Sequence, residues 1–157
     1  MPGNDAASSG PFSTKRTGGL PLQDFITLCF SGQQAEADVR RMVMGAGGLV
    51  AYLGTNDASQ VEQRIKQGDS QAEEVYQAMS YQIAKEIGAM ATVLSGQVDA
   101  IVLTGGLSKS EMLTEWVSER VLFMAPVVVI PGEYEMEALA LGVLRVLRGE
   151  EEAKEYT

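Results

Sequence analysis

Apolar residues recur along this chain in two patterns, one at helical spacing and one in short uninterrupted runs. Spacings of three and four residues over 70–94 predict the longest helix, with a single buried stripe. The stripe consists of Val75, Met79, Ile83, Ile87, Met90 and Leu94. Shorter stretches of the same pattern predict helices over 21–30, 35–44, 58–67, 108–123 and 135–147. The first of these is apolar over so broad a face that we expect it to be buried, together with Cys29.

Two uninterrupted apolar runs, 100–103 and 127–130, predict buried strands. A third run, 49–53, fits either a strand or a buried loop. Runs without alternation predict cover on both faces, as in a parallel sheet whose strands are joined by helices. The predicted fold class is therefore α/β with an incomplete sheet, because two strands make a poor sheet for so many helices. Either unusual helix packing buries the strands, or the rest of the sheet belongs to sequence outside this chain.

The strand predicted over 100–103 leads into a glycine pair, Gly105-Gly106, and then to Ser108. Glu111 follows three residues later, and this spacing is a capping box that predicts a helix start at Ser108. A strand, a glycine turn and a helix N-terminus together suit a nucleotide. Glycine lets the backbone approach the ligand, and the unpaired N–H groups of the helix attract an anion.

Other polar residues have structural explanations beside functional ones. Asp57 and Gln60 form a second capping box, and N-capping alone explains Asp57. Arg16 lies in a loop bounded by glycines and a proline, which would expose an ordinary surface arginine equally well. Three glutamates within 133–137 stand at the start of the last predicted helix, where the helix dipole favours negative charge and a metal role is the alternative.

The composition of the chain excludes several classes of partner and of catalysis. The 157 residues suffice for one domain, with 1–10 expected to be a flexible end and 150–157 an acidic tail. A net charge of −9 argues against a nucleic-acid or anionic-membrane partner, because both need a positive surface. The absence of histidine excludes Ser-His-Asp catalysis and His-ligated zinc. With no apolar run long enough for a membrane and no signal-peptide core, we expect the protein to be cytoplasmic.

Five stretches taken together resemble the butyrate kinases of the acetokinase family: 10–21, 47–57, 81–91, 99–106 and 126–132. The resemblance extends from about residue 10 to residue 156. It implies the actin, hexokinase and Hsp70-like superfamily, in which two lobes of ribonuclease-H-like fold enclose a cleft. Residues 11–149 then correspond to part of the nucleotide-binding C-terminal lobe. The N-terminal lobe and a glycine-rich phosphate hairpin are expected to lie outside this chain.

The activity implied by the resemblance is transfer of the γ-phosphoryl group of ATP to butyrate, giving butyryl phosphate and ADP, or the reverse, with Mg²⁺ as cofactor. The expected partners are a nucleotide, a short-chain carboxylate and the missing N-terminal lobe. Without that lobe the isolated chain is predicted to be inactive. Three alternatives stay open: a nucleotide-binding module without catalysis, a kinase of another short or branched-chain carboxylate, and a fragment that forms a homo-oligomer through the helix over 70–94.

The resemblance also implies roles for individual residues. Arg16 matches an arginine placed against the transferring phosphoryl group, where an always-charged guanidinium would neutralise developing charge. Asp57 matches an acidic residue near the adenosine, and Glu135 aligns with a glutamate associated with Mg²⁺. The other nucleotide-binding candidates belong to the adenosine loop: Thr104, Gly105, Gly106, Leu107 and Ser108. We expect Arg16 to reach the same cavity as the glycine pair.

Overall fold

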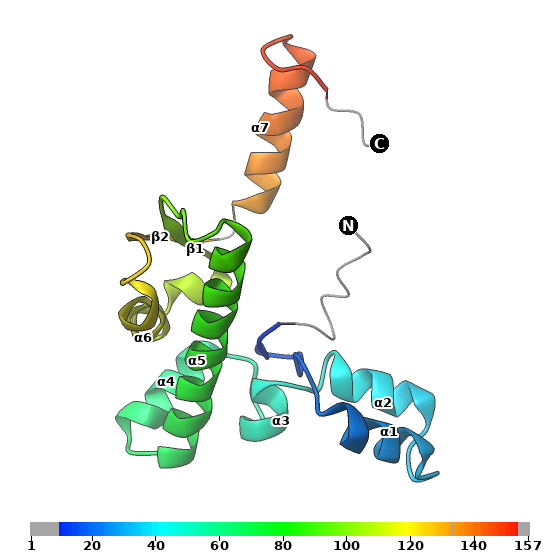
Figure 1. Ribbon diagram of the computed structural model, residues 1–157. Coiled ribbons are helices and arrows are strands. Elements are labelled where there is room, and N and C mark those ends of the chain that lie inside the picture. The colour runs from blue at the N-terminus through cyan, green and yellow to red at the C-terminus, as the bar shows by residue number, and fades with distance from the viewer. Residues whose placement is uncertain (1–9, 133, 154–157) are drawn as a thin grey trace.

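The computed structural model describes residues 10–132 and 134–153, with helices first and then an alternation of strands and helices (Figure 1). The α-helices are α1 (Leu22–Phe30), α2 (Glu36–Val43), α3 (Leu49–Leu53), α4 (Ala58–Lys66), α5 (Ser70–Val93), α6 (Glu111–Val121) and α7 (Glu135–Leu147). The strands are β1 (Ile101–Gly105) and β2 (Val127–Pro131), and a 3₁₀ turn, η1 (Gly106–Lys109), follows β1.

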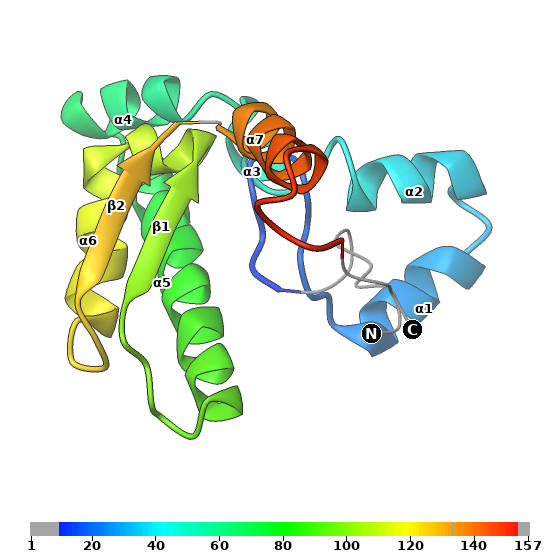
Figure 2. The ribbon, with the colours of Figure 1, turned by 90° about the horizontal axis from the view of Figure 1, so that it is seen from above.

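The two strands form a parallel sheet, as the uninterrupted apolar runs predict, with Ile101 paired to Val127. Figure 2 shows α5 and α6 together behind one face of this sheet. The opposite face is open in the described structure, since Val102, Val128 and Ile130 are 54%, 44% and 45% exposed. The expectation of cover on both faces is therefore wrong for this chain, because both covering helices lie on the same side.

The core lies between α4, α5, α6 and the covered face of the sheet. Tyr76 and Met79 of α5 are fully buried, as are Val61 of α4 and Val117 of α6. The ring of Tyr76 meets that of Trp116 edge-on, with centroids 5.9 Å apart. Since α4 and α6 both pack on α5, this core sets where the start of α4 lies relative to the turn after β1.

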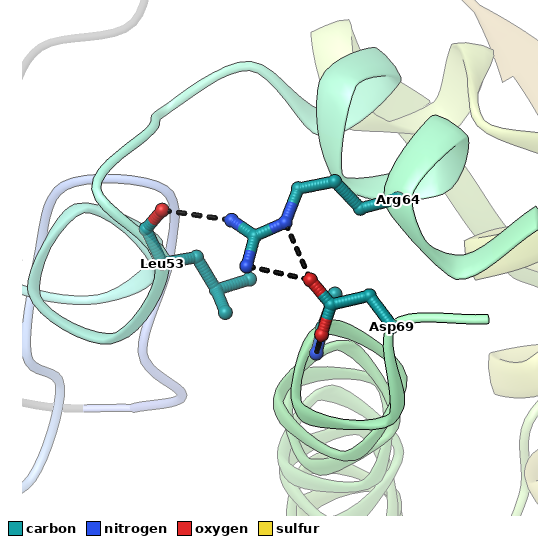
Figure 3. A network of polar contacts seen from close by, with 4 residues as sticks. Leu53, Arg64 and Asp69 are labelled. Atoms are coloured by element: carbon teal, nitrogen blue, oxygen red, sulfur yellow. Dashed lines mark hydrogen bonds and ion pairs between the residues drawn. The ribbon is translucent and has the colours of Figure 1, made fainter. Parts of the chain in front are cut away.

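A polar network joins α3, α4 and the start of α5 (Figure 3). Asp69 caps α5 by accepting a hydrogen bond from the backbone N–H of Ala72 at 3.0 Å. The Arg64 guanidinium donates to the Asp69 carboxylate at 2.8 Å and to the Leu53 carbonyl oxygen at 2.9 Å. The hydrogen bond from Ala72, and after it the one from Arg64, lower the pKa of Asp69 from its ordinary value of 3.8.

Residues 49–53 form a helix, α3, so the expectation of a strand or a buried loop is wrong. Two glycines with left-handed φ flank it, Gly48 at +59° and Gly54 at +74°. Gly54 ends the helix because glycine adopts the left-handed C-terminal conformation without a steric penalty. Only Leu49 of α3 is buried, where it joins the core cluster.

One further expectation of burial is wrong, and another holds only in part. None of the residues of α1 is buried and Cys29 is exposed, because α1 and α2 project to one side of the molecule (Figure 1). The stripe on α5 is buried at Met79, but Met90 and Leu94 at its far end are 54% and 55% exposed. The far end of α5 therefore lies beyond the elements that cover its middle.

The last helix, α7, rises from the side of the sheet that α5 and α6 leave open (Figure 1). Its apolar side chains are exposed, among them Met136 at 78% and Leu139 at 66%. None of the helices in the described residues combines the length and the hydropathy that a bilayer crossing requires.

Candidate functional site

A hollow of about 630 Å³ lies where the start of α4 faces the turn after β1. Its lining comes from three segments of the chain: Thr14, Asn56, Asp57, Ala58, Ser59, Glu62, Gly106, Leu107, Lys109 and Ser110. Carboxylates, an ammonium group and hydroxyls share this wall, so the hollow suits a polar ligand. It brings together three residues that the sequence singles out, Asp57, Gly106 and Leu107.

The α4 side of the hollow is built on an N-cap. The Asp57 carboxylate accepts a hydrogen bond from the Ser59 N–H at 2.9 Å, and the Asp57 N–H donates to the Thr55 hydroxyl at 3.1 Å. The predicted capping box is only half formed, because Gln60 accepts from the Thr55 hydroxyl, at 3.0 Å. Asp57 is thus a helix cap that also lines the hollow.

The opposite side begins with Gly105, whose φ of +90° and ψ of −176° suit only glycine. This conformation turns the chain from β1 into η1. Ser108 is buried, and its hydroxyl donates to the Gly105 carbonyl at 2.7 Å and to the Ile130 carbonyl at 3.3 Å. Of the predicted loop residues, Thr104, Gly105 and Ser108 do not line the hollow.

Ser110 is the N-cap of α6, so the prediction that the helix starts at Ser108 is wrong. The 3₁₀ turn η1 separates the two serines, and Ser108 uses its hydroxyl to close that turn. The Ser110 hydroxyl accepts from the Leu113 N–H at 3.0 Å and from the buried Tyr76 hydroxyl at 3.0 Å. Burial raises the pKa of the Tyr76 hydroxyl to about 12, which keeps it a donor near neutral pH.

Arg16 is exposed and is not among the residues that line the hollow, although Thr14 is. Backbone contacts hold this segment in place. The Ser13 N–H donates to the Arg16 carbonyl at 3.0 Å, and Arg16 forms an antiparallel bridge with Met44. The Val50 N–H donates to the Thr14 carbonyl at 3.1 Å. The catalytic role of Arg16 stays a prediction.

Glu135 is the first residue of α7, and its side chain lies outside the described part of the structure. Among side chains that are described, no group of three or more acidic or cysteine residues is placed to hold a metal ion. Because Mg²⁺ keeps several water ligands and binds largely through substrate phosphates, its site needs few protein ligands. The metal and the role of Glu135 stay predictions from the family resemblance.

Thr14, Asn56 and Glu62 are among the lining residues that were not singled out from the sequence. Helical spacing is a signal that could have found Glu62, because it lies three residues after Ser59 on the same face of α4. Thr14 has no such signal, since long-range contacts place its segment, among them the hydrogen bonds from Phe12 to Gln82 of α5 and from Val50 of α3 to the Thr14 carbonyl.

Helices packed on a partial parallel sheet define this chain as an α/β protein with part of a ribonuclease-H-like fold. Solved structures share the arrangement. The acetate kinase of Porphyromonas gingivalis superposes with a TM-score of 0.74 at 21% identity, over 87% of this chain and 41% of its own. That of Entamoeba histolytica gives 0.73 at 16% identity, over 85% of this chain and 42% of its own. Structural similarity at such low sequence identity shows a shared fold and nothing more.

The sequence comparison then gives the family. The model of the acetokinase family matches residues 16–128, more than half of the chain, and the chain therefore belongs to the acetokinase family. Probable butyrate kinase 2 of Caldanaerobacter subterraneus subsp. tengcongensis is 52% identical over 153 residues. A probable butyrate kinase of Listeria monocytogenes serotype 4b is 47% identical over the same length. Each match covers 98% of this chain, but the chain spans only 43% of either relative. The predicted family and fold class are both confirmed.

Proposed function

We propose that this chain is the nucleotide-binding part of a carboxylate kinase, which transfers the γ-phosphoryl group of ATP to butyrate and also runs in reverse. Membership of the acetokinase family supports a carboxylate kinase, and the butyrate kinases among its relatives support butyrate as the acceptor. The observation that carries the proposal is the hollow, because it unites Asp57 with Gly106 and Leu107, from segments about 50 residues apart.

The lining of the hollow suits the adenosine part of the nucleotide. Carboxylate oxygens of Asp57 and Glu62 accept hydrogen bonds, and the ribose offers hydroxyl donors. Gly106 carries no side chain to hold the ligand away, and Leu107 adds an apolar surface for the base. The phosphates would extend out of the hollow, toward the rest of the enzyme.

Phosphoryl transfer relies on positioning and on neutralising charge, and a kinase needs little covalent chemistry of its own. We assign Arg16 the role of countering charge on the transferring phosphoryl oxygens, since a guanidinium stays charged at any working pH. Mg²⁺ would neutralise phosphate charge when bound. The carboxylate acceptor would lie in the part of the enzyme that the relatives carry in addition to the share that this chain spans.

The adenosine assignment is tested by Asp57→Asn. Asparagine is as good an N-cap as aspartate, so the fold should be kept while the carboxylate is lost. Calorimetry with ADP should show binding by the chain and about 5-fold to 10-fold weaker binding by the variant, because a neutral amide oxygen accepts a weaker hydrogen bond than a carboxylate does. Glu36→Gln, an exposed change on α2, is the control and should bind like the original chain. Equal ADP affinity in Asp57→Asn would overturn the assignment.

A second candidate function is nucleotide binding without catalysis, which is favoured by a hollow whose lining suits a nucleotide but does not include Arg16. An assay for the formation of butyryl phosphate from ATP and butyrate distinguishes the two candidate functions. We expect no product from the chain alone. We expect product when the chain is joined, as one polypeptide, to the part of the Caldanaerobacter relative outside the matched 153 residues. If that linked polypeptide binds ADP but makes no acyl phosphate from butyrate or another short-chain acid, binding alone is the function.

A further inference from the structure

Lys109 is the only basic residue among the described residues that line the hollow between α4 and η1. It is the last residue of η1, the 3₁₀ turn that starts at Gly106. Residues three apart in a 3₁₀ helix lie on the same face, so Lys109 shares a face with Gly106. Because glycine has no side chain, the space in front of Gly106 is left to the Lys109 side chain and to a ligand.

The ammonium group of Lys109 is exposed and has no hydrogen-bond or ion-pair partner within the part of the chain that the structure describes. It therefore keeps its N–H donors for a ligand. The hydroxyls of Ser108 and Ser110, on either side of it in the sequence, already take part in hydrogen bonds within the protein. On the η1 side of the hollow, Lys109 is thus the side chain that offers a charged donor to a ligand.

A purine can meet such a donor at the edge that carries N7 and the substituent at C6. In guanine, and likewise in hypoxanthine, this edge presents two acceptors, N7 and O6, whereas in adenine it presents the N7 acceptor beside the N6 amino donor. An ammonium group can donate to both acceptors of a 6-oxopurine, but beside adenine it also faces a donor. Lys109 therefore favours a 6-oxopurine when the base lies against Leu107, two residues earlier in η1.

We propose that Lys109 is a specificity-determining residue that lets the hollow bind 6-oxopurine nucleotides, those of guanine and hypoxanthine, at least as tightly as ADP. The inference rests on the proposed function, because it requires a nucleotide whose base lies in the hollow. Asp57 and Glu62 keep their role as acceptors for the ribose, which is the same in all of these nucleotides. The kinase would then take its phosphoryl group from GTP or ITP as well as from ATP.

Calorimetry with ADP and IDP tests the preference, because the two ligands share the ribose and the diphosphate and differ only in the purine. IDP should bind the chain at least as tightly as ADP. An affinity for IDP more than about 5-fold below that for ADP would overturn the inference and leave the proposed function standing. If neither nucleotide binds, the proposed function fails and this inference fails with it.

Three variants test whether Lys109 sets this preference. Lys109→Met removes the ammonium group and should lower the affinity for IDP by about 10-fold, as for one lost hydrogen bond from a charged group, and that for ADP by less than about 2-fold. Lys109→Arg keeps a charged donor that can reach both N7 and O6, so it should preserve the affinity for IDP. Lys66→Met makes the first change at an exposed lysine of α4 that does not line the hollow, and it should alter neither affinity.

Two results with Lys109→Met would overturn the inference. An equal loss of affinity for ADP and IDP would show that the ammonium group meets the phosphates, which the two ligands share. An unchanged affinity for IDP would show that Lys109 is only a solvated surface lysine. Because both lysines are exposed, all three variants should keep the melting temperature of the original chain, and a change in affinity then reports a ligand contact and not a folding defect.

Discussion

The Tyr76 hydroxyl links the core to the candidate site through one hydrogen bond. It donates to the Ser110 hydroxyl, which caps α6 and lines the hollow at the same time. Neither residue stands out in the sequence as part of a pair, because they are 34 positions apart. A buried side chain that touches no ligand is thereby placed to hold a wall of the site.

Tyr76→Phe removes this hydrogen bond while keeping the ring against Trp116. We expect it to lower the free energy of unfolding by about 1–2 kcal/mol, because Ser110 loses a buried donor. Affinity for ADP should also fall severalfold. Urea denaturation and calorimetry measure the two effects. Tyr81→Phe makes the same change at an exposed position of α5 and should alter neither quantity. Similar losses in the two variants would show that the hydroxyl has no specific role.

Gly48 has a backbone conformation and surroundings that only glycine fits. Its φ is +59°, and a Cβ built there would overlap the Ser13 carbonyl oxygen. Gly54 has a φ of +74° but open space around it, so it isolates the cost of the conformation alone. Gly54→Ala should cost about 1 kcal/mol and Gly48→Ala about 3 kcal/mol or more, because the second change adds overlap to strain. Denaturant midpoints of the two variants give the comparison, and equal costs would contradict it.

At the scale of elements, the joint between α3, α4 and α5 depends on the ionised form of Asp69. Its pKa is lowered in the folded protein, so the unfolded chain binds more protons as the pH falls below about 4. The stabilisation from this group is complete above that pH and is lost as the pH falls through the folded-state pKa.

Asp69→Asn keeps an N-cap on α5 but loses the ion pair with Arg64. We expect a lower melting temperature than that of the original chain at pH 7, and a difference that shrinks as the pH falls below 4. Thermal melts between pH 2.5 and 7 measure it. Asp24→Asn, in the first turn of α1, controls for the loss of one negative charge. A difference that is independent of pH would show that the carboxylate charge does not stabilise this joint.

Most elements could be predicted because helical spacing and uninterrupted apolar runs are local properties of the sequence. The start of α6 could not be predicted, since Ser108 and Ser110 are both serines near the end of a strand and either could cap the helix. The choice between them depends on the Ile130 carbonyl, which Ser108 reaches across the sheet, and on Tyr76, which meets Ser110. The five residues of α3 are too few for periodicity to separate a helix from a strand.

At the scale of the whole molecule, the proposed reaction needs more than this chain holds. The hollow is the proposed site for adenosine, while Arg16 lies outside its lining on a segment fixed by backbone hydrogen bonds. The proposed catalytic role of Arg16 therefore has to be measured in the linked polypeptide, which includes the part of the enzyme proposed to bind the carboxylate acceptor.

Arg16→Lys in the linked polypeptide should lower kcat by about 100-fold or more, because an ammonium group cannot reproduce the planar contacts of a guanidinium with a transferring phosphoryl group. Affinity for ADP should change little. Steady-state kinetics measure kcat, and calorimetry measures the affinity for ADP. Arg40→Lys, at an exposed arginine paired with Glu36, is the matched control. An unchanged kcat in Arg16→Lys would remove Arg16 from the proposed mechanism.

The sequence by itself determined the α/β class, the parallel strands, the capping role of Asp57 and the family, because each depends on local spacing or on motifs read in order. Tertiary structure alone decided which of the predicted nucleotide-binding residues line one hollow, namely Asp57, Gly106 and Leu107, and that Ser108 closes a turn. It also decided that the far end of the α5 stripe and one face of the sheet are left uncovered. An apolar stripe on a helix or an apolar run in a strand shows that a surface is apolar. Whether that surface is buried depends on which other elements are present to pack against it.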